Sequence, residues 1–378
     1  MKFRCDRDAL SEALQTVQRG VSPRPGIPAL TGVLMEVGDG SLTLTTTDLE
    51  VSARLSIDVQ AQEPGVALVP ARLLVDTVKS LSVAPVEFEA DAAQARIRCA
   101  AYEGSLRLLP AEDFPTLQTP GGTHVTVDAP TFAEAVGQVA RAASRDEARP
   151  MLTGVLLEVS REGVTLVATD SYRLAIRELV ATASAEARAI VPERALSEAG
   201  RAAQSVEKGS VEISIDESQV TFKVGGFVLT SRLIEGEFPK YRALIPEASD
   251  NSLTVSRQHL MDAVKRVGLL ARDNAPIRME FNAIGVRLSS SSPDLGQAVE
   301  AVEAKYQGED LTTAFNPHYL NDGLAAVPGE SVRLEVRDGL KPGIVRGESD
   351  DFTYLVMPSR GARPRYATGA GRRTGITR

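Results

Sequence analysis

The 378-residue chain is poor in the residues from which redox, metal and disulfide sites are built. It has no tryptophan, two cysteines (Cys5 and Cys99) and three histidines (His124, His259 and His318). Two cysteines cannot make a disulfide scaffold and are typical of a reducing compartment, where they serve as small buried hydrophobes. No histidine lies at metal-ligand spacing from a cysteine. We therefore expect no metal and no cofactor.

Long apolar runs are also missing. No stretch approaches the about 18 apolar residues of a transmembrane helix, and the charged start MKFRCDRD lacks the apolar segment of a secretory signal. We expect a cytoplasmic protein. The hydrophobic fraction of 43% and the charged fraction of 24% are ordinary for a globular chain. The net charge of −8, taken as a global number, argues against non-specific binding to nucleic acid.

No catalytic motif stands out. The sequence has no phosphate-binding loop, no nucleophile elbow, no zinc-protease motif and no C-x-x-C pair. Asp48 and Asp170 recur at equivalent places and suggest paired carboxylates for acid–base chemistry, but Ser292 stands at the third equivalent place. An aspartate that accepts backbone N–H groups in a strand-end turn explains them better. We expect a protein that is not an enzyme.

An internal repeat is the strongest feature that the sequence does have. Residues 30–37 (LTGVLMEV) and 152–159 (LTGVLLEV) agree at seven of eight positions at an offset of 122. A second step of 122 brings residues 157–159 onto residues 279–281, so three copies fit in the chain. The expected domains are 1–121, 122–248 and 249–360, followed by a basic tail, 361–378, that we expect to be disordered.

Each copy has the same internal plan. Leu10, Ala13, Leu14 and Val17 fall on one helical face, and the pattern recurs in the other two copies. A glycine-punctuated strand pair follows, and then a second helix, which begins after a proline in two copies and after Asn-Pro in the third. The sequence therefore predicts an α+β fold with two strand–helix–strands units per copy. We expect six helices on one face of six small, mainly antiparallel sheets.

The polar faces of the predicted helices mix both charges. Arginines and lysines lie opposite the apolar stripes, but Glu12, Asp76, Glu134, Glu198 and Asp262 lie among them. Taken helix by helix, an ordinary solvated surface explains this pattern better than a basic stripe.

Ten short stretches of the chain form a recognisable set: Met1-Lys2-Phe3, Arg24-Pro25, Ile27-Pro28, Asp113-Phe114-Pro115, Thr169-Asp170, Arg173-Leu174, Phe238-Pro239, Tyr241-Arg242, Val356-Met357-Pro358 and Arg360. Through these stretches the whole chain through residue 360 resembles the bacterial DNA sliding clamp, the β subunit of DNA polymerase III. The resemblance implies a DNA-clamp fold and a head-to-tail dimeric ring, with helices inside around duplex DNA and antiparallel sheets outside. It also implies a processivity factor, located with the nucleoid, that a clamp loader opens and that tethers polymerases and repair proteins.

The resemblance removes the conflict with the negative net charge. Acids can lie on the outer sheets while cations face the pore, and a ring that holds DNA by topology needs only weak, salt-sensitive phosphate contacts. Arg149 is a better candidate for the DNA-facing set than its neighbours Pro150 and Met151, whose positions can be aromatic in relatives. The implied DNA-facing residues are Arg19, Arg24, Arg72, Lys79, Arg141, Arg145, Arg149, Arg194, Arg201, Lys265 and Arg266.

The resemblance further implies a groove for a short hydrophobic peptide carried by the polymerase III α subunit, the clamp loader and other partners. Any single leucine of this groove is explained equally well by core packing. Ser171, Tyr172 and Ala243 depart from residues that the family often has, which we expect to alter peptide preference. The implied groove residues are Leu152, Thr169, Arg173, Leu174, Pro239, Leu244, Asn316, Tyr319, Leu355, Met357, Pro358 and Arg360.

The implied dimer contact joins the first domain of one chain to the third domain of the other. Leu269 and Leu270, at the end of the fifth predicted helix, match the apolar pair that forms part of it. The basic tail is hypothesised to touch DNA or to screen the groove. Two other interpretations stay open: a repeat-built interaction scaffold that never encircles DNA, and a hydrolase with an unrecognised site.

Overall fold

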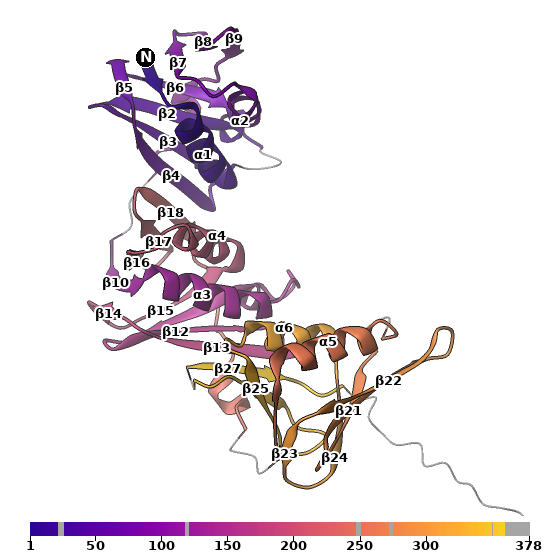
Figure 1. Ribbon diagram of the computed structural model, residues 1–378. Coiled ribbons are helices and arrows are strands. Elements are labelled where there is room, and N and C mark those ends of the chain that lie inside the picture. Colours follow the sequence, from indigo (N-terminus) through magenta and orange to yellow (C-terminus); the bar gives the residue numbers. More distant parts are fainter. Residues whose placement is uncertain (22–25, 118–120, 247–250, 272–274, 350, 360–378) are drawn as a thin grey trace, which may run out of the picture. The chain divides into compact units, whose positions relative to one another are not determined.

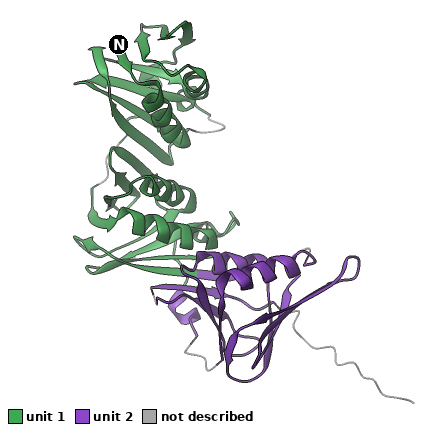
Figure 2. Ribbon diagram, viewed as in Figure 1, with its two compact units in different colours: residues 1–170, 175–239 green, residues 171–174, 240–378 purple. Residues whose placement is uncertain are grey.

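The computed structural model describes the chain except for residues 22–25, 118–120, 247–250, 272–274, 350 and 360–378. The predicted tail therefore lies outside the described residues. Figure 2 shows two compact units. The first contains residues 1–170 and 175–239, and the second contains residues 171–174 and 240–378.

The described residues form six α-helices, each at the place that the repeat predicts (Figure 1). The first helix of each copy follows a side-chain cap: Asp6 accepts hydrogen bonds from two backbone N–H groups, and Asp128 and Ser256 from one each. The second helices of the first two copies follow Pro70 and Pro192. The helices are α1 (Arg7–Val17), α2 (Ala71–Ser80), α3 (Ala129–Val139), α4 (Glu193–Gln204), α5 (Arg257–Gly268) and α6 (Pro317–Ala326).

Antiparallel sheets back the helix pairs in both units. In the first unit a five-stranded sheet has the order β5-β1-β7-β8-β9, a nine-stranded sheet has the order β14-β10-β16-β17-β18-β4-β3-β2-β6, and β15, β11, β12 and β13 are consecutive neighbours. Their bounds are β1 (Lys2–Cys5), β2 (Gly32–Gly38), β3 (Ser41–Thr47), β4 (Val51–Asp58), β5 (Gln60–Glu63), β6 (Gly65–Pro70), β7 (Val86–Ala90), β8 (Gln94–Cys99), β9 (Tyr102–Arg107), β10 (Thr123–Asp128), β11 (Gly154–Val159), β12 (Gly163–Thr169), β13 (Arg173–Val180), β14 (Thr182–Ala183), β15 (Ala187–Pro192), β16 (Ser210–Ile215), β17 (Gln219–Val224) and β18 (Phe227–Arg232).

The second unit repeats the plan. One set of neighbouring strands has the order β27-β26-β25-β19-β23, and a four-stranded sheet has the order β22-β21-β20-β24. Their bounds are β19 (Ser252–Ser256), β20 (Ile277–Asn282), β21 (Gly285–Ser292), β22 (Gly296–Glu303), β23 (Lys305–Gln307), β24 (Leu311–Phe315), β25 (Ser331–Val336), β26 (Gly343–Arg346) and β27 (Phe352–Val356).

The expectation of six separate small sheets is wrong. In the first unit, β4 of the first repeat pairs with β18 of the second, with Leu55 opposite Phe227 and Val51 opposite Ser231. Two edge strands that would each leave a row of unpaired N–H and C=O groups satisfy one another, so two repeats share one nine-stranded sheet.

The apolar stripes of the helices form the core, as the periodicity predicts. Leu10, Leu14 and Val17 of α1 are fully buried. In the second repeat α3 and α4 lie side by side (Figure 1), and a Cβ atom at Gly200 would come within 2.8 Å of the Val136 side chain. A glycine at this position therefore permits the close approach of the two helices.

The two cysteines are buried and free, as expected. Burial raises the pKa of the Cys5 thiol to about 12, which makes it a poor nucleophile. The turn interpretation of Asp48 is confirmed: its carboxylate accepts hydrogen bonds from the backbone N–H groups of Glu50 at 3.1 Å and Val51 at 2.7 Å.

Candidate functional site

A cluster of two tyrosines with an ion pair and a methionine lies on the second unit, formed by Tyr172, Arg173, Tyr319, Asp322 and Met357. The rings of Tyr172 and Tyr319 stack with centroids 6.1 Å apart and planes 18° apart. The Arg173 guanidinium lies 4.7 Å from the Tyr319 ring centroid and forms an ion pair with Asp322. The backbone N–H of Met357 donates to the Tyr172 carbonyl at 2.8 Å. We call these five residues the Tyr172 cluster.

Local structure explains how these side chains are held. Asn316 caps the first turn of α6 by accepting from the backbone N–H of His318 at 2.9 Å, and Tyr319 lies in that turn. The Tyr354 hydroxyl donates to the Tyr319 carbonyl at 2.8 Å. Ser171, just before Tyr172, has a φ of 78°, in the left-handed region that costs a non-glycine residue roughly 1 kcal/mol. The chain therefore carries backbone strain at the start of the cluster.

The predicted groove residues differ widely in exposure. Of the second-unit members, Leu244 is 51% and Met357 is 42% exposed, and Arg173, Tyr319 and Pro358 are half-buried. Pro239, in the first unit, is also exposed. Arg360 lies outside the described residues. The buried members are Leu152 and Thr169 of the first unit and Leu174, Asn316 and Leu355 of the second.

The structure brings Arg173, Tyr319 and Met357 together through Tyr172, which the predicted set omitted. Tyr172 is 58% exposed, so most of its ring faces solvent while one part packs on Tyr319. The signal in the sequence was its departure from the family pattern next to Arg173. An exposed aromatic side chain beside a cation is typical of a recognition surface.

Three of the predicted DNA-facing arginines belong to an ion-pair network in the first unit. Arg19 lies 2.9 Å from the Glu198 carboxylate, which also pairs with Arg201. Arg194 pairs with Asp48 at 3.0 Å and donates to the Arg19 carbonyl at 2.9 Å. The network joins the first repeat to the second, so these arginines have a structural role besides any contact with a ligand.

The other predicted cations vary in their surroundings. Arg72 is almost fully exposed, with its nearest carboxylate, Asp76, at 4.0 Å. Arg149 pairs with Asp146 at 2.9 Å, and Arg266 pairs with Glu300 at 2.6 Å. Arg24 lies outside the described residues. The remaining members, Lys79, Arg141, Arg145 and Lys265, are exposed.

The predicted dimer residues lie at the end of α5. Leu269, the residue just after the helix, is 76% exposed, and Leu270 is half-buried. A leucine that exposes three quarters of its surface is an apolar contact point on the unpartnered chain.

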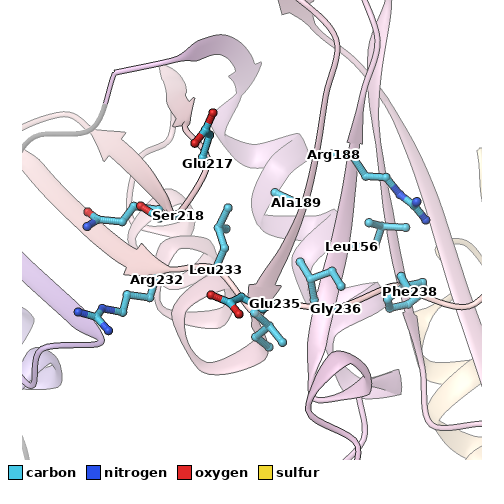
Figure 3. A pocket seen from close by; sticks show the side chains of 13 residues that line it. Leu156, Arg188, Ala189, Glu217, Ser218, Arg232, Leu233, Glu235, Gly236 and Phe238 are labelled. Atoms are coloured by element: carbon cyan, nitrogen blue, oxygen red, sulfur yellow. The ribbon is translucent and has the colours of Figure 1, made fainter.

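A cavity of about 650 Å³ opens in the first unit (Figure 3). Arg188 and Ala189 of β15, the turn at Glu217 and Ser218, and the segment 232–236 line it, as Figure 3 shows. None of the predicted groove residues lines this cavity. Within the described residues no cluster of His, Cys, Asp or Glu has the composition of a metal site, and no helix is long and apolar enough to cross a membrane.

Repeated helix pairs backed by antiparallel sheets define a clamp-type scaffold. Comparison with models of known protein families agrees with this description of the fold. Models of the DNA polymerase III beta subunit match the chain three times: the N-terminal domain at residues 1–118, the central domain at 126–240 and the C-terminal domain at 242–360. The chain belongs to the DNA polymerase III beta subunit family.

Similar proteins are sliding clamps. The beta sliding clamp of Streptomyces coelicolor is 38% identical over 374 residues, which cover 95% of this chain and 99% of the relative. The solved sliding clamp of Bacillus subtilis has a TM-score of 0.90 at 30% identity, and that of Pseudomonas aeruginosa bound to griselimycin has 0.91 at 31%. Both alignments cover 95% of this chain and 99% of the other. The chain is therefore a sliding clamp, a non-enzymatic processivity factor of DNA replication.

Proposed function

We propose that two copies of the chain close head to tail into a ring around duplex DNA, and that the ring carries replication and repair proteins in the cytoplasm, at the nucleoid. Three domains, 1–121, 122–248 and 249–360, would form each half of the ring. The family matches at 1–118, 126–240 and 242–360 support these boundaries, as does the pair of helices in each segment.

The observation that carries this proposal is a pair of open sheet edges. Inside the chain, β4 of the first repeat pairs with β18 of the second. Two of the equivalent strands, β22 (the fourth strand of the third repeat) and β9 (the last strand of the first), lie at sheet edges. A second copy placed head to tail pairs β22 with β9 twice, which closes a ring instead of extending a filament.

The polar faces of the helices would then meet DNA. Exposed cations such as Arg72, Lys79, Arg145 and Lys265 supply phosphate contacts without reading base edges. Acids on the same faces keep those contacts weak, which suits a ring that has to slide.

The Tyr172 cluster, with Leu244 and Pro358, is the proposed peptide-binding surface. Its exposed apolar atoms suit a short hydrophobic segment, and methionine adapts to different side chains. Segments of this kind in polymerases, the clamp loader and repair proteins are the expected ligands. A solved structure of the P. aeruginosa clamp has griselimycin bound, so griselimycin can serve as the probe ligand.

The decisive test is topological. The chain is loaded onto nicked circular DNA by its clamp loader with ATP, free protein is removed, and the circle is then cut once. A ring stays on the intact circle and is lost from the linear product. Equal retention on both would contradict encirclement. Absence from both, with a known clamp loading in parallel, would favour the scaffold interpretation.

A further inference from the structure

The junction between the first and second repeats is a template for the junction between two copies. It has three parts: the β4–β18 strand pairing, the ion pair of Arg19 with Glu198, and the ion pair of Arg194 with Asp48. Because the repeats share their element order, each part has an equivalent position where the third repeat of one copy meets the first repeat of another.

The equivalent charged positions follow from where each element begins. Counted from the first residues of α1 and α5, Arg19 corresponds to Leu269. Counted from the starts of β3 and β21, Asp48 corresponds to Ser292. On the other side, α4 and α2 place Arg72 where Arg194 stands and Asp76 where Glu198 stands. The first repeat therefore keeps both of its charged residues, Arg72 and Asp76. The third repeat has Leu269 and Ser292 where their charged partners would stand.

The strand register of the internal junction can be carried over to the junction between copies in the same way. Phe227 opens β18 as Tyr102 opens β9, and Ser52 has the place in its hairpin that Gln297 has in the third repeat. Because Thr230 lies opposite Ser52, Ser105 is expected opposite Gln297 of the second copy. Tyr102 and Ser105 of β9 and Gln297 of β22 are exposed, as residues of an unpaired sheet edge should be.

Two of the charged residues on these edges already have partners within their own copy, whereas Arg107 of β9 and Glu303 of β22 are exposed. Glu103 of β9 pairs with Arg98 at 3.1 Å, and Glu300 of β22 pairs with Arg266 at 2.6 Å. Apolar side chains nearby stay uncovered: Leu73 is 52%, Tyr102 is 41% and Val299 is 49% exposed, and Leu269 even more. At the internal junction, Ala195 takes the place of Leu73 and is fully buried.

We propose that the junction between two copies keeps the strand pairing of the internal junction but lacks both of its ion pairs, so that backbone pairing and apolar contact hold it. This inference rests on the proposed head-to-tail dimer. It makes the junction between copies the one that separates without breaking the equivalents of these two ion pairs. Such a junction suits a ring that has to be opened for DNA to enter.

The register is tested by disulfide trapping between copies. A Ser105→Cys chain is mixed with a Gln297→Cys chain and oxidised, so that only a contact between copies gives a covalent dimer. Directly opposed residues in an antiparallel pair have Cα atoms about 4.5–5.5 Å apart, which fits a disulfide. Ala301→Cys is the matched control on the same strand face, about 13 Å away along the strand. The native cysteines are buried and stay unchanged.

The missing ion pairs are tested by supplying one. Ser292→Asp places a carboxylate where Asp48 stands, facing Arg72 of the second copy, and Ser292→Asn is the neutral control. With one new pair at each of two junctions, we expect the dimer dissociation constant to fall about two- to thirty-fold for the aspartate and to stay unchanged for the asparagine. Adding Arg72→Ala should abolish the gain.

The outcomes separate the inference from the dimer on which it rests. A wild-type chain that stays monomeric at micromolar concentration would overturn the dimer itself. A dimer that cross-links through Ala301→Cys instead of Gln297→Cys would overturn the register. If Arg72→Ala alone weakens the wild-type dimer tenfold, Arg72 already pairs across the junction, with Asp294 of the hairpin turn after Ser292 as a candidate partner, and the absence of an ion pair at this place is refuted. Equal dissociation constants for Ser292→Asp and Ser292→Asn would refute it as well.

Discussion

Removing the ring of Tyr172 is the sharpest test of the proposed peptide-binding surface. A tyrosine can bury about 200 Å², and Tyr172 is 58% exposed, so roughly 80 Å² is covered in the unliganded chain. At 25 cal/mol per Å², Tyr172→Ala should lower the free energy of unfolding by up to about 2 kcal/mol. A ligand that covers half of the remaining surface buries about 60 Å² more, or about 1.5 kcal/mol, so the alanine variant should bind about tenfold more weakly.

Griselimycin binding by calorimetry is the assay, with thermal unfolding measured in parallel. Tyr172→Phe keeps the ring that stacks on Tyr319 and should bind within about twofold of the wild type. Leu340→Ala is the matched control, because Leu340 is an apolar side chain of the same unit that is 82% exposed. A Tyr172→Ala variant that folds and binds as tightly as the wild type would refute the assignment of this surface.

Three further predictions concern other parts of the chain. Glu198→Gln, which frees the two arginines that Glu198 pairs with, should tighten binding to linear duplex DNA several-fold at low salt. Glu212→Gln, on the outer sheet, changes the net charge by the same amount and should not tighten DNA binding. Equal effects of the two variants would refute the assignment of the helix faces to DNA. Gly200→Leu should destabilise the first unit by about 2 kcal/mol or more in chemical denaturation, because its side chain would overlap Val136 of α3. Cys5, with its pKa raised by burial, should react with a thiol reagent at pH 8 only after denaturation, and prompt labelling of the native chain would contradict its burial.

Local patterns predicted the elements well because they are set by neighbours in sequence. The apolar spacing of Leu10, Leu14 and Val17, together with the cap at Asp6, is enough to specify α1 and its buried face. The 122-residue repeat then transferred this result to the second and third copies. The shared sheet was missed because pairing of β4 with β18 depends on edges 170 or so residues apart, which no local period reports.

The site was harder to predict for a related reason. The sequence indicates that Arg173, Tyr319 and Met357 are candidates only through resemblance, and it gives no sign that Tyr172 stacks on Tyr319. Likewise, Arg19 and Glu198 lie 179 residues apart, and their ion pair depends on how two helices of different repeats approach. Charge counted along each helix therefore does not report which cations are paired within the protein.

These ion pairs explain how an acidic chain serves as a clamp. On the helix faces, Glu198 is shared by two arginines, and Asp76 lies one helical turn from Arg72, so much of the positive charge is balanced within the protein. A protein held on DNA by affinity alone could not tolerate the loss of these cations to internal ion pairs, because its phosphate contacts supply the binding free energy. A closed ring can tolerate it, because its retention on DNA depends on the strength of its junctions. In the proposed ring, the selective demand therefore moves from the pore to the edges β9 and β22, whose strand pairing and apolar contact would set how long the ring stays closed.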